Sequence, residues 1–135
     1  MPSITVELRN IAGTGAALGW AGSHTVVVDR PQGRAGGTGL GFNGGELLAL
    51  AIGGCFCNDL RYAAESMDVG LGQIAVDVVL DLAGEPLLAT GATLTVSCIT
   101  LDGGDAAPVV ERATRESSVA NSLIRGIPVT VIEAD

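Results

Sequence analysis

The longest hydrophobic block of the chain runs from Leu47 to Cys57, and nearly every position in it is apolar. Asn43 precedes the block and is suited to cap a helix, while the carboxylate of Glu46 suits the positive end of a helix dipole. About twenty residues then follow without a proline. The pattern therefore predicts one long helix from Glu46 to Met67.

Because the block is apolar on every side of the predicted helix, we expect protein to surround it. It is too short to span a bilayer, which needs about 20 apolar residues, and the polar pair Asn58-Asp59 ends it. Gly53 and Gly54 stand in mid-helix, where each glycine costs up to about 1 kcal/mol relative to alanine. We therefore expect another element to cross the helix there at close range.

Apolar and polar residues alternate before the predicted helix, which is the pattern of half-exposed strands. Strands are expected at residues 4–8 and 25–28, separated by a glycine-broken segment, 13–22, that carries the only tryptophan. Residues 29–45 hold a proline and seven glycines without any periodicity. This segment is expected to be a loop that leads into the helix.

After the helix, alternation over residues 74–82 and 93–98 predicts a hairpin that turns at Gly84-Glu85-Pro86 and has Cys98 on its inward face. Asp105 suits the cap of a second helix through about Arg115, residues 117–124 suit a further turn or short helix, and residues 127–132 suit a last strand. This order of elements predicts an α+β fold with its helices against antiparallel sheet.

The length of 135 residues predicts a single domain over residues 1–135. Only four residues are aromatic, so the core must be built from smaller side chains, and an oligomer interface often completes such a core. The net charge of -8 without any lysine argues against nucleic acid or an anionic membrane as a partner. The N-terminus has no signal-peptide pattern and the three cysteines have no framework spacing, so a cytoplasmic location with free thiols is expected.

Two motifs of the chain suggest chemistry that the rest of the sequence argues against. Residues 39–44 fit G-x-G-x-x-G, but a dinucleotide fold needs a strand running into the first glycine and a repeated βαβ pattern. Cys55 and Cys57 stand two apart on the predicted helix, about 200° from each other, so both thiols cannot reach one metal ion. His24 is the only histidine, which removes the usual partners of a zinc site or a Cys-His nucleophile. We expect no metal and no cofactor.

The segments around Cys55 resemble the OsmC/Ohr family of osmotically induced and organic hydroperoxide resistance proteins. The resemblance rests on HTVVVDRP at residues 24–31, the Gly36-Gly37 pair and GFNGGELLALAIGGC at residues 41–55. It extends to SSVANSL at residues 117–123, which looks like the family's second cysteine motif, and to GIPV at residues 126–129. The match covers most of the chain in the right order.

The resemblance implies a homodimer in which two long helices pack together and are wrapped by sheets. It also implies a thiol peroxidase, with Cys55 as the peroxidatic thiol that attacks an organic hydroperoxide. Such a thiol needs a nearby cation, for which we take Arg30, in the loop before the helix, as the candidate among Arg9, Arg30 and Arg34.

Two positions depart from the family pattern. The second cysteine falls at Ser117, which cannot form a disulfide. The family's Asn-Pro-Glu reads Asn43-Gly44-Gly45, so Glu46 stands one residue beyond the expected glutamate, and we take Glu46 as the candidate for its catalytic role. The sequence leaves two hypotheses. One is a peroxide reductase that uses Cys55, with Cys57 as a poor substitute partner, and is re-reduced by an external thiol. The other is a non-catalytic dimer that binds a small hydrophobic ligand near Cys55.

Overall fold

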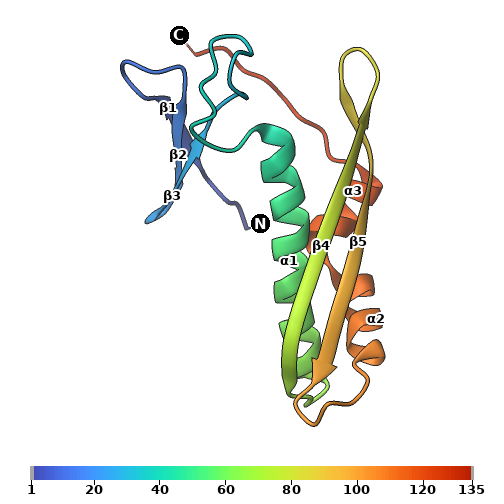
Figure 1. The fold of residues 1–135 in the computed structure, drawn as a ribbon. Coiled ribbons are helices and arrows are strands. Elements are labelled where there is room, and N and C mark those ends of the chain that lie inside the picture. The colour runs from blue at the N-terminus through green and yellow to red at the C-terminus, as the bar shows by residue number, and fades with distance from the viewer. Residues whose placement is uncertain (1, 135) are drawn as a thin grey trace. The chain divides into compact units, whose positions relative to one another are not determined.

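The structure is a computed structural model that describes residues 2–134 (Figure 1). Its contacts divide the chain into two compact units, one up to Leu48 and one from Ala49 onward, and the long helix α1 (Gly44–Ser66) begins in the first and continues in the second. The division leaves the expectation of a single domain as a prediction. No helix within residues 2–134 is both long and apolar enough to cross a bilayer.

The first unit contains a three-stranded antiparallel sheet in the order β1-β2-β3. Its strands are β1 (Glu7–Asn10), β2 (Ala17–Ala21) and β3 (His24–Val28). The strand predicted at residues 25–28 is confirmed as β3. The strand predicted at residues 4–8 is shifted along the chain, because residues 4–6 lie outside β1 and β1 continues to Asn10. β2 was missed, since the sequence showed only a segment broken by glycines. Gly19 fits within β2 because a Cβ there would lie 3.3 Å from Leu8, so the bare backbone makes room for β1.

The loop after β3 is organised around the buried carboxylate of Asp29. One oxygen accepts a hydrogen bond from the N–H of Arg30, and the other accepts from the N–H groups of Thr38 and Leu40 and from the Thr38 hydroxyl. These backbone hydrogen bonds, chiefly that of Leu40, hold the pKa of Asp29 below its ordinary value. The Asp29 side chain therefore links the start of an otherwise irregular loop to its later residues Thr38 and Leu40.

A reciprocal capping box begins α1. The side chain of Asn43 accepts a hydrogen bond from the N–H of Glu46, and the Glu46 carboxylate accepts one from the N–H of Asn43. Two backbone donors that the first turn would leave open are thus satisfied. The predicted cap and the long helix are confirmed.

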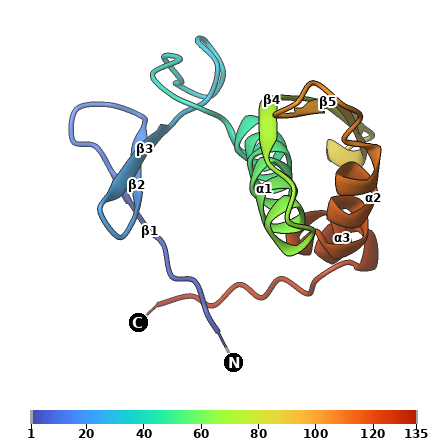
Figure 2. The same ribbon diagram turned by 90° about the horizontal axis from the view of Figure 1, so that it is seen from below.

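The second unit packs one face of α1 against a long hairpin of β4 (Leu71–Ala83) and β5 (Leu88–Thr100). Figure 2 shows α1 along β4, with α2 (Ala107–Glu116) on the same side of the hairpin. The alternation predicted for both strands is confirmed, since every second residue from Leu94 to Thr100 is partly buried. The core cluster comprises Phe56, Leu60, Ala63 and Ala64 of α1, Leu71 of β4, and Ala106, Val109 and Ala113 at α2.

The expected close crossing occurs at Gly53, whereas the second unit covers only one face of α1. A Cβ at Gly53 would lie 2.9 Å from Cγ2 of Val78 in β4, whereas Gly54 has nothing within 4 Å. Leu50 and Tyr62 are 54% and 67% exposed on the open face of the helix. Within the second unit, α1 is therefore buried on one side only.

The chain ends with helix α3 (Ser118–Arg125) and an extended segment. Asp105 accepts a hydrogen bond from the N–H of Ala107 at the start of α2, and Gly126, with φ of 78°, ends α3 as expected. The prediction of a strand over residues 127–132 is wrong, because the structure pairs this segment with no neighbouring strand. An apolar alternation identifies a strand only where a second strand supplies the hydrogen bonds.

Candidate functional site

The thiol of Cys55 lies between two polar side chains of the second unit. It donates a hydrogen bond to Oδ2 of Asp59, one turn further along α1, over 3.6 Å. Its sulfur also lies 3.8 Å from the hydroxyl of Ser118, the first residue of α3. Because the S–H group donates to the carboxylate, the Ser118 hydroxyl is the donor in the second contact. Cys55 is only partly buried, so a small reactant can reach it.

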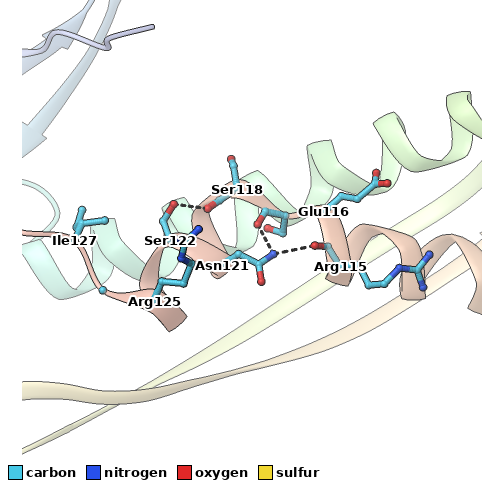
Figure 3. Close-up of a pocket in the computed structure, with 9 residues that line it drawn as sticks. Arg115, Glu116, Ser118, Asn121, Ser122, Arg125 and Ile127 are labelled. Atoms are coloured by element: carbon cyan, nitrogen blue, oxygen red, sulfur yellow. Dashed lines mark hydrogen bonds between the residues drawn. The ribbon is translucent and has the colours of Figure 1, made fainter. Parts of the chain in front are cut away.

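The position of Ser118 depends on the junction between α2 and α3. The side-chain amide of Asn121 donates hydrogen bonds to the backbone carbonyls of Thr114, Arg115 and Ser117, two of which are drawn in Figure 3. The carbonyls of Thr114 and Arg115 in the last turn of α2 lack helical partners, and the amide satisfies them. The carbonyl of Ser117, which precedes α3, also accepts from the backbone N–H of Asn121. The junction is thereby fixed, and α3 begins beside α1.

A polar depression of about 540 Å³ lies at this junction (Figure 3). Arg115 and Arg125 contribute the cationic side chains, and the Ser118 side chain is directed away from that of Asn121. Arg115 is engaged in an ion pair with Glu111 over 3.2 Å. The depression itself is open to solvent around the start of α3 and is not an enclosed cavity.

A second, apolar depression of about 410 Å³ lies between α1, β5 and α3. Ile52, one turn before Cys55, lines it together with Ala120 of α3. The remaining lining residues are Thr90, Gly91, Ala92 and Leu94 of β5 and Leu123 and Ile124 of α3. This surface suits a hydrocarbon group, and its lining residues Ile52 and Ala120 stand close in the sequence to Cys55 and Ser118.

Ser117 precedes Ser118 but makes no hydrogen bond to the Cys55 sulfur. It is 1% exposed, and its hydroxyl is buried without a hydrogen-bond partner. It occupies the N-cap position of α3 without a side-chain capping hydrogen bond. The hydroxyl that contacts the thiol is thus that of the next residue, Ser118.

Glu46 and Arg30, which the resemblance suggested as catalytic residues, belong to the first unit and have partners there. Glu46 closes the capping box with Asn43. The Arg30 guanidinium donates to the carbonyl of Gly15 over 2.8 Å and lies 3.8 Å from Asp29, while its Nε is buried without a partner. Both side chains therefore have structural contacts, and their catalytic roles stay predictions.

The other two cysteines have different surroundings. Cys57 is partly buried and unpaired. Cys98 is partly buried against the core, as expected, and burial raises the pKa of its thiol, against a smaller opposing effect of Arg61. Cys98 is therefore a packing residue that stays protonated at neutral pH. Within residues 2–134 no three His, Cys, Asp or Glu side chains are grouped so that they could hold a metal ion.

Sequence reasoning missed both partners of Cys55. The spacing of Cys55 and Asp59 is i,i+4, which places two helical side chains on one face, so this contact was accessible from the sequence. No local pattern indicated Ser118, because its approach depends on how α3 docks in the folded chain.

The fold and this site define an α+β protein that carries a half-buried thiol on a long helix. Residues 37–132 match the family model of OsmC-like proteins, and the chain belongs to this family. Comparison with curated proteins finds no match.

Solved structures confirm the fold. An OsmC-like protein from Mycoplasma pneumoniae superimposes with a TM-score of 0.75 at 11% identity, covering 91% of this chain and 88% of that one. An OsmC-like protein of unknown function from Vibrio cholerae gives 0.77 at 10% identity, covering 90% and 94%. An organic hydroperoxide resistance protein from Legionella pneumophila gives 0.65 at 17% identity, covering 91% and 90%.

Proposed function

We propose that this protein is a thiol-dependent reductase of organic hydroperoxides, with Cys55 as the peroxidatic thiol. Membership of the OsmC-like family and the fold shared with an organic hydroperoxide resistance protein support a role in peroxide defence. The observation that carries the proposal is the accessible Cys55 thiol, hydrogen-bonded on α1 and contacted by a hydroxyl at the start of α3.

In the proposed reaction, the Cys55 sulfur attacks the terminal peroxide oxygen. An S–O bond forms and the O–O bond breaks, so that the thiol becomes a sulfenic acid and the hydroperoxide leaves as an alcohol. Because Ser118, rather than a second cysteine, contacts the sulfur, an external thiol must condense with the sulfenic acid and release water. A second external thiol then frees Cys55 and leaves as a disulfide.

The alternative function is binding of a small hydrophobic ligand without catalysis. The apolar depression lined by Ile52 and Ala120 favours it, because such a surface would hold an alkyl or aromatic group near Cys55. In the enzyme, the same depression would receive the organic part of the peroxide.

We further propose that the protein is a homodimer. Leu50 and Tyr62 expose apolar surface on the open face of α1. The unpaired C-terminal segment exposes Ile127, Val129 and Val131, which are 63%, 82% and 92% accessible. A second copy that packs against these side chains would remove them from water. With three free thiols, we place this dimer in the reducing cytoplasm.

Trapping of the oxidised sulfur tests the function. One equivalent of cumene hydroperoxide should make Cys55 reactive toward a sulfenic-acid probe, which mass spectrometry of peptides locates, and a small thiol should reverse the oxidation. Cys57→Ser should label like the wild type, and Cys55→Ser should not label. A folded wild-type protein whose Cys55 stays unlabelled would move the assignment to the ligand-binding dimer.

A further inference from the structure

The Cys55 thiol donates its hydrogen bond to a carboxylate that is itself largely removed from water. Asp59 is 9% exposed, and the thiol is the side-chain hydrogen-bond partner that the structure gives it. The ion pairs of residues 49–134 join Arg112 to Glu116 and Arg115 to Glu111, so none includes Asp59. A buried carboxylate without a cation needs another source of compensation.

This pairing creates a conflict for a peroxidatic thiol. If the thiol lost its proton to water, a thiolate would stand 3.6 Å from a carboxylate, and two negative charges at that distance repel strongly in a partly buried site. If the proton passes from sulfur to the carboxylate instead, the pair holds one negative charge before and after the transfer. Proton transfer within the pair therefore avoids the repulsion that direct ionisation creates.

We propose that Asp59 is the catalytic proton acceptor of Cys55 and the proton donor to the leaving oxygen, an inference that rests on the proposed peroxide reductase function. The S–H proton moves to Oδ2 of Asp59 as the sulfur bonds to the terminal peroxide oxygen. The O–O bond breaks, and the departing alkoxide takes the proton from Asp59 to leave as an alcohol. Cys55 ends as a sulfenic acid and Asp59 as a carboxylate, so one group acts first as base and then as acid.

Ser118 has a complementary part in this step. Its hydroxyl donates toward the sulfur over 3.8 Å. A neutral donor stabilises negative charge on sulfur without competing for the proton. The three side chains Cys55, Asp59 and Ser118 thus supply a nucleophile, a proton carrier and a charge-stabilising donor.

The decisive experiment measures the rate of sulfenic-acid formation with cumene hydroperoxide in wild type and Asp59→Asn. Asparagine keeps the size of the side chain but cannot take a proton, so the rate at pH 7 should fall by about 100-fold. Above about pH 9.5, where hydroxide ionises ordinary thiols, the variant should recover much of the lost rate. A merely structural role of Asp59 would produce no such recovery. Glu65→Gln, which removes an exposed carboxylate from the same helix, should react like the wild type.

Each outcome decides for or against this role. An Asp59→Asn protein that reacts as fast as a reactive wild type overturns the role of Asp59 as proton acceptor. A variant that reacts faster also overturns this role, because the carboxylate then hinders formation of the thiolate. If Asp59→Asn does not fold, Asp59→Glu retains a carboxylate and should react within about 10-fold of wild type; a folded glutamate variant without reactivity overturns the role. An unreactive wild-type protein overturns the proposed function itself, and this role with it.

Discussion

Ser118 determines which chemistry the Cys55 sulfur meets after oxidation. Its hydroxyl, 3.8 Å from that sulfur, occupies a place from which a thiol could attack a sulfenic acid. The neighbouring Ser117 is buried, and its hydroxyl makes no hydrogen bond to the sulfur. The local fold thus has room for a two-cysteine cycle, but the side chain at the contact is an alcohol.

Replacing Ser118 with cysteine should therefore create an intramolecular disulfide with Cys55 on treatment with one equivalent of hydroperoxide. The physical reason is the contact distance, which needs only a small adjustment to allow bond formation. Intact mass should fall by about two mass units on oxidation, reversibly, and the sulfenic-acid probe should no longer label Cys55. Ser117→Cys is the matched control, and a disulfide that forms at position 117 but not 118 would contradict the assigned contact.

Asp29 offers a pH-dependent test at the scale of a single residue. Its native pKa is lowered by the backbone hydrogen bonds of Leu40, Arg30 and Thr38, so the folded state binds this proton more weakly than the unfolded state. The stabilisation is present above the ordinary Asp range near pH 4 and is lost as the pH falls through the lowered native pKa. Asp29→Asn should lower Tm at pH 7, and its difference from wild type should shrink below pH 4. A difference that is constant with pH would contradict the role of the charged carboxylate.

At the scale of elements, α1 packs closely against β4 because residue 53 is a glycine and has no side chain. A Cβ at Gly53 would lie 2.9 Å from Val78, whose β-branched side chain has little freedom to move away. In an open helix, Gly→Ala would gain about 1 kcal/mol, but overpacking costs about 1 to 3 kcal/mol. We expect Gly53→Ala to lower the free energy of unfolding by about 1 kcal/mol in urea titrations.

Gly91→Ala is the control for this substitution. Gly91 lies on β5, where an added Cβ meets nothing within 4 Å, so the free energy of unfolding should stay within about 0.5 kcal/mol of wild type. If Gly53→Ala were stabilising, the helix and strand could separate enough to admit a methyl group, and the close crossing would not be a constraint on the fold.

The elements that the sequence predicted well are those specified by their own residues. The capping box at Asn43, the turn at Gly84 to Pro86 and the stop at Gly126 are local signals, and each coincides with an element boundary in the structure. β2 was missed because Gly19 interrupts its alternation; a larger residue there would come too close to Leu8 of β1. The C-terminal strand was predicted in error because its alternation says nothing about whether a partner strand is available.

The site divides in the same way. Cys55 was identified through the family resemblance, and Asp59 follows from helical periodicity, but Ser118 approaches from a residue 63 positions away. Such a contact depends on the α2–α3 junction and cannot be read from one segment alone. Tertiary docking decides which of two adjacent serines meets the thiol.

At the scale of the whole molecule, the exposed apolar surface predicts self-association. Light scattering should give about twice the 13.5 kDa chain mass at micromolar concentration. Leu50→Glu, which introduces a charge on the open face of α1, should shift the protein toward the monomer mass. Glu65→Gln should leave the mass unchanged. A stable monomer of the wild type would refute the dimer.

The hydrogen bonds of the Asn121 side-chain amide have a consequence for protein that is stored. Its amide nitrogen serves the carbonyls of Thr114, Arg115 and Ser117, and asparagine is among the residues that are lost chemically with heat and time. Hydrolysis of this amide would replace the shared donor with a carboxylate oxygen facing three carbonyl oxygens. A change of one mass unit at position 121, outside the reacting groups, would release the start of α3 and with it the hydroxyl beside the sulfur. Stored protein could thus lose reactivity while its thiols remain fully reduced.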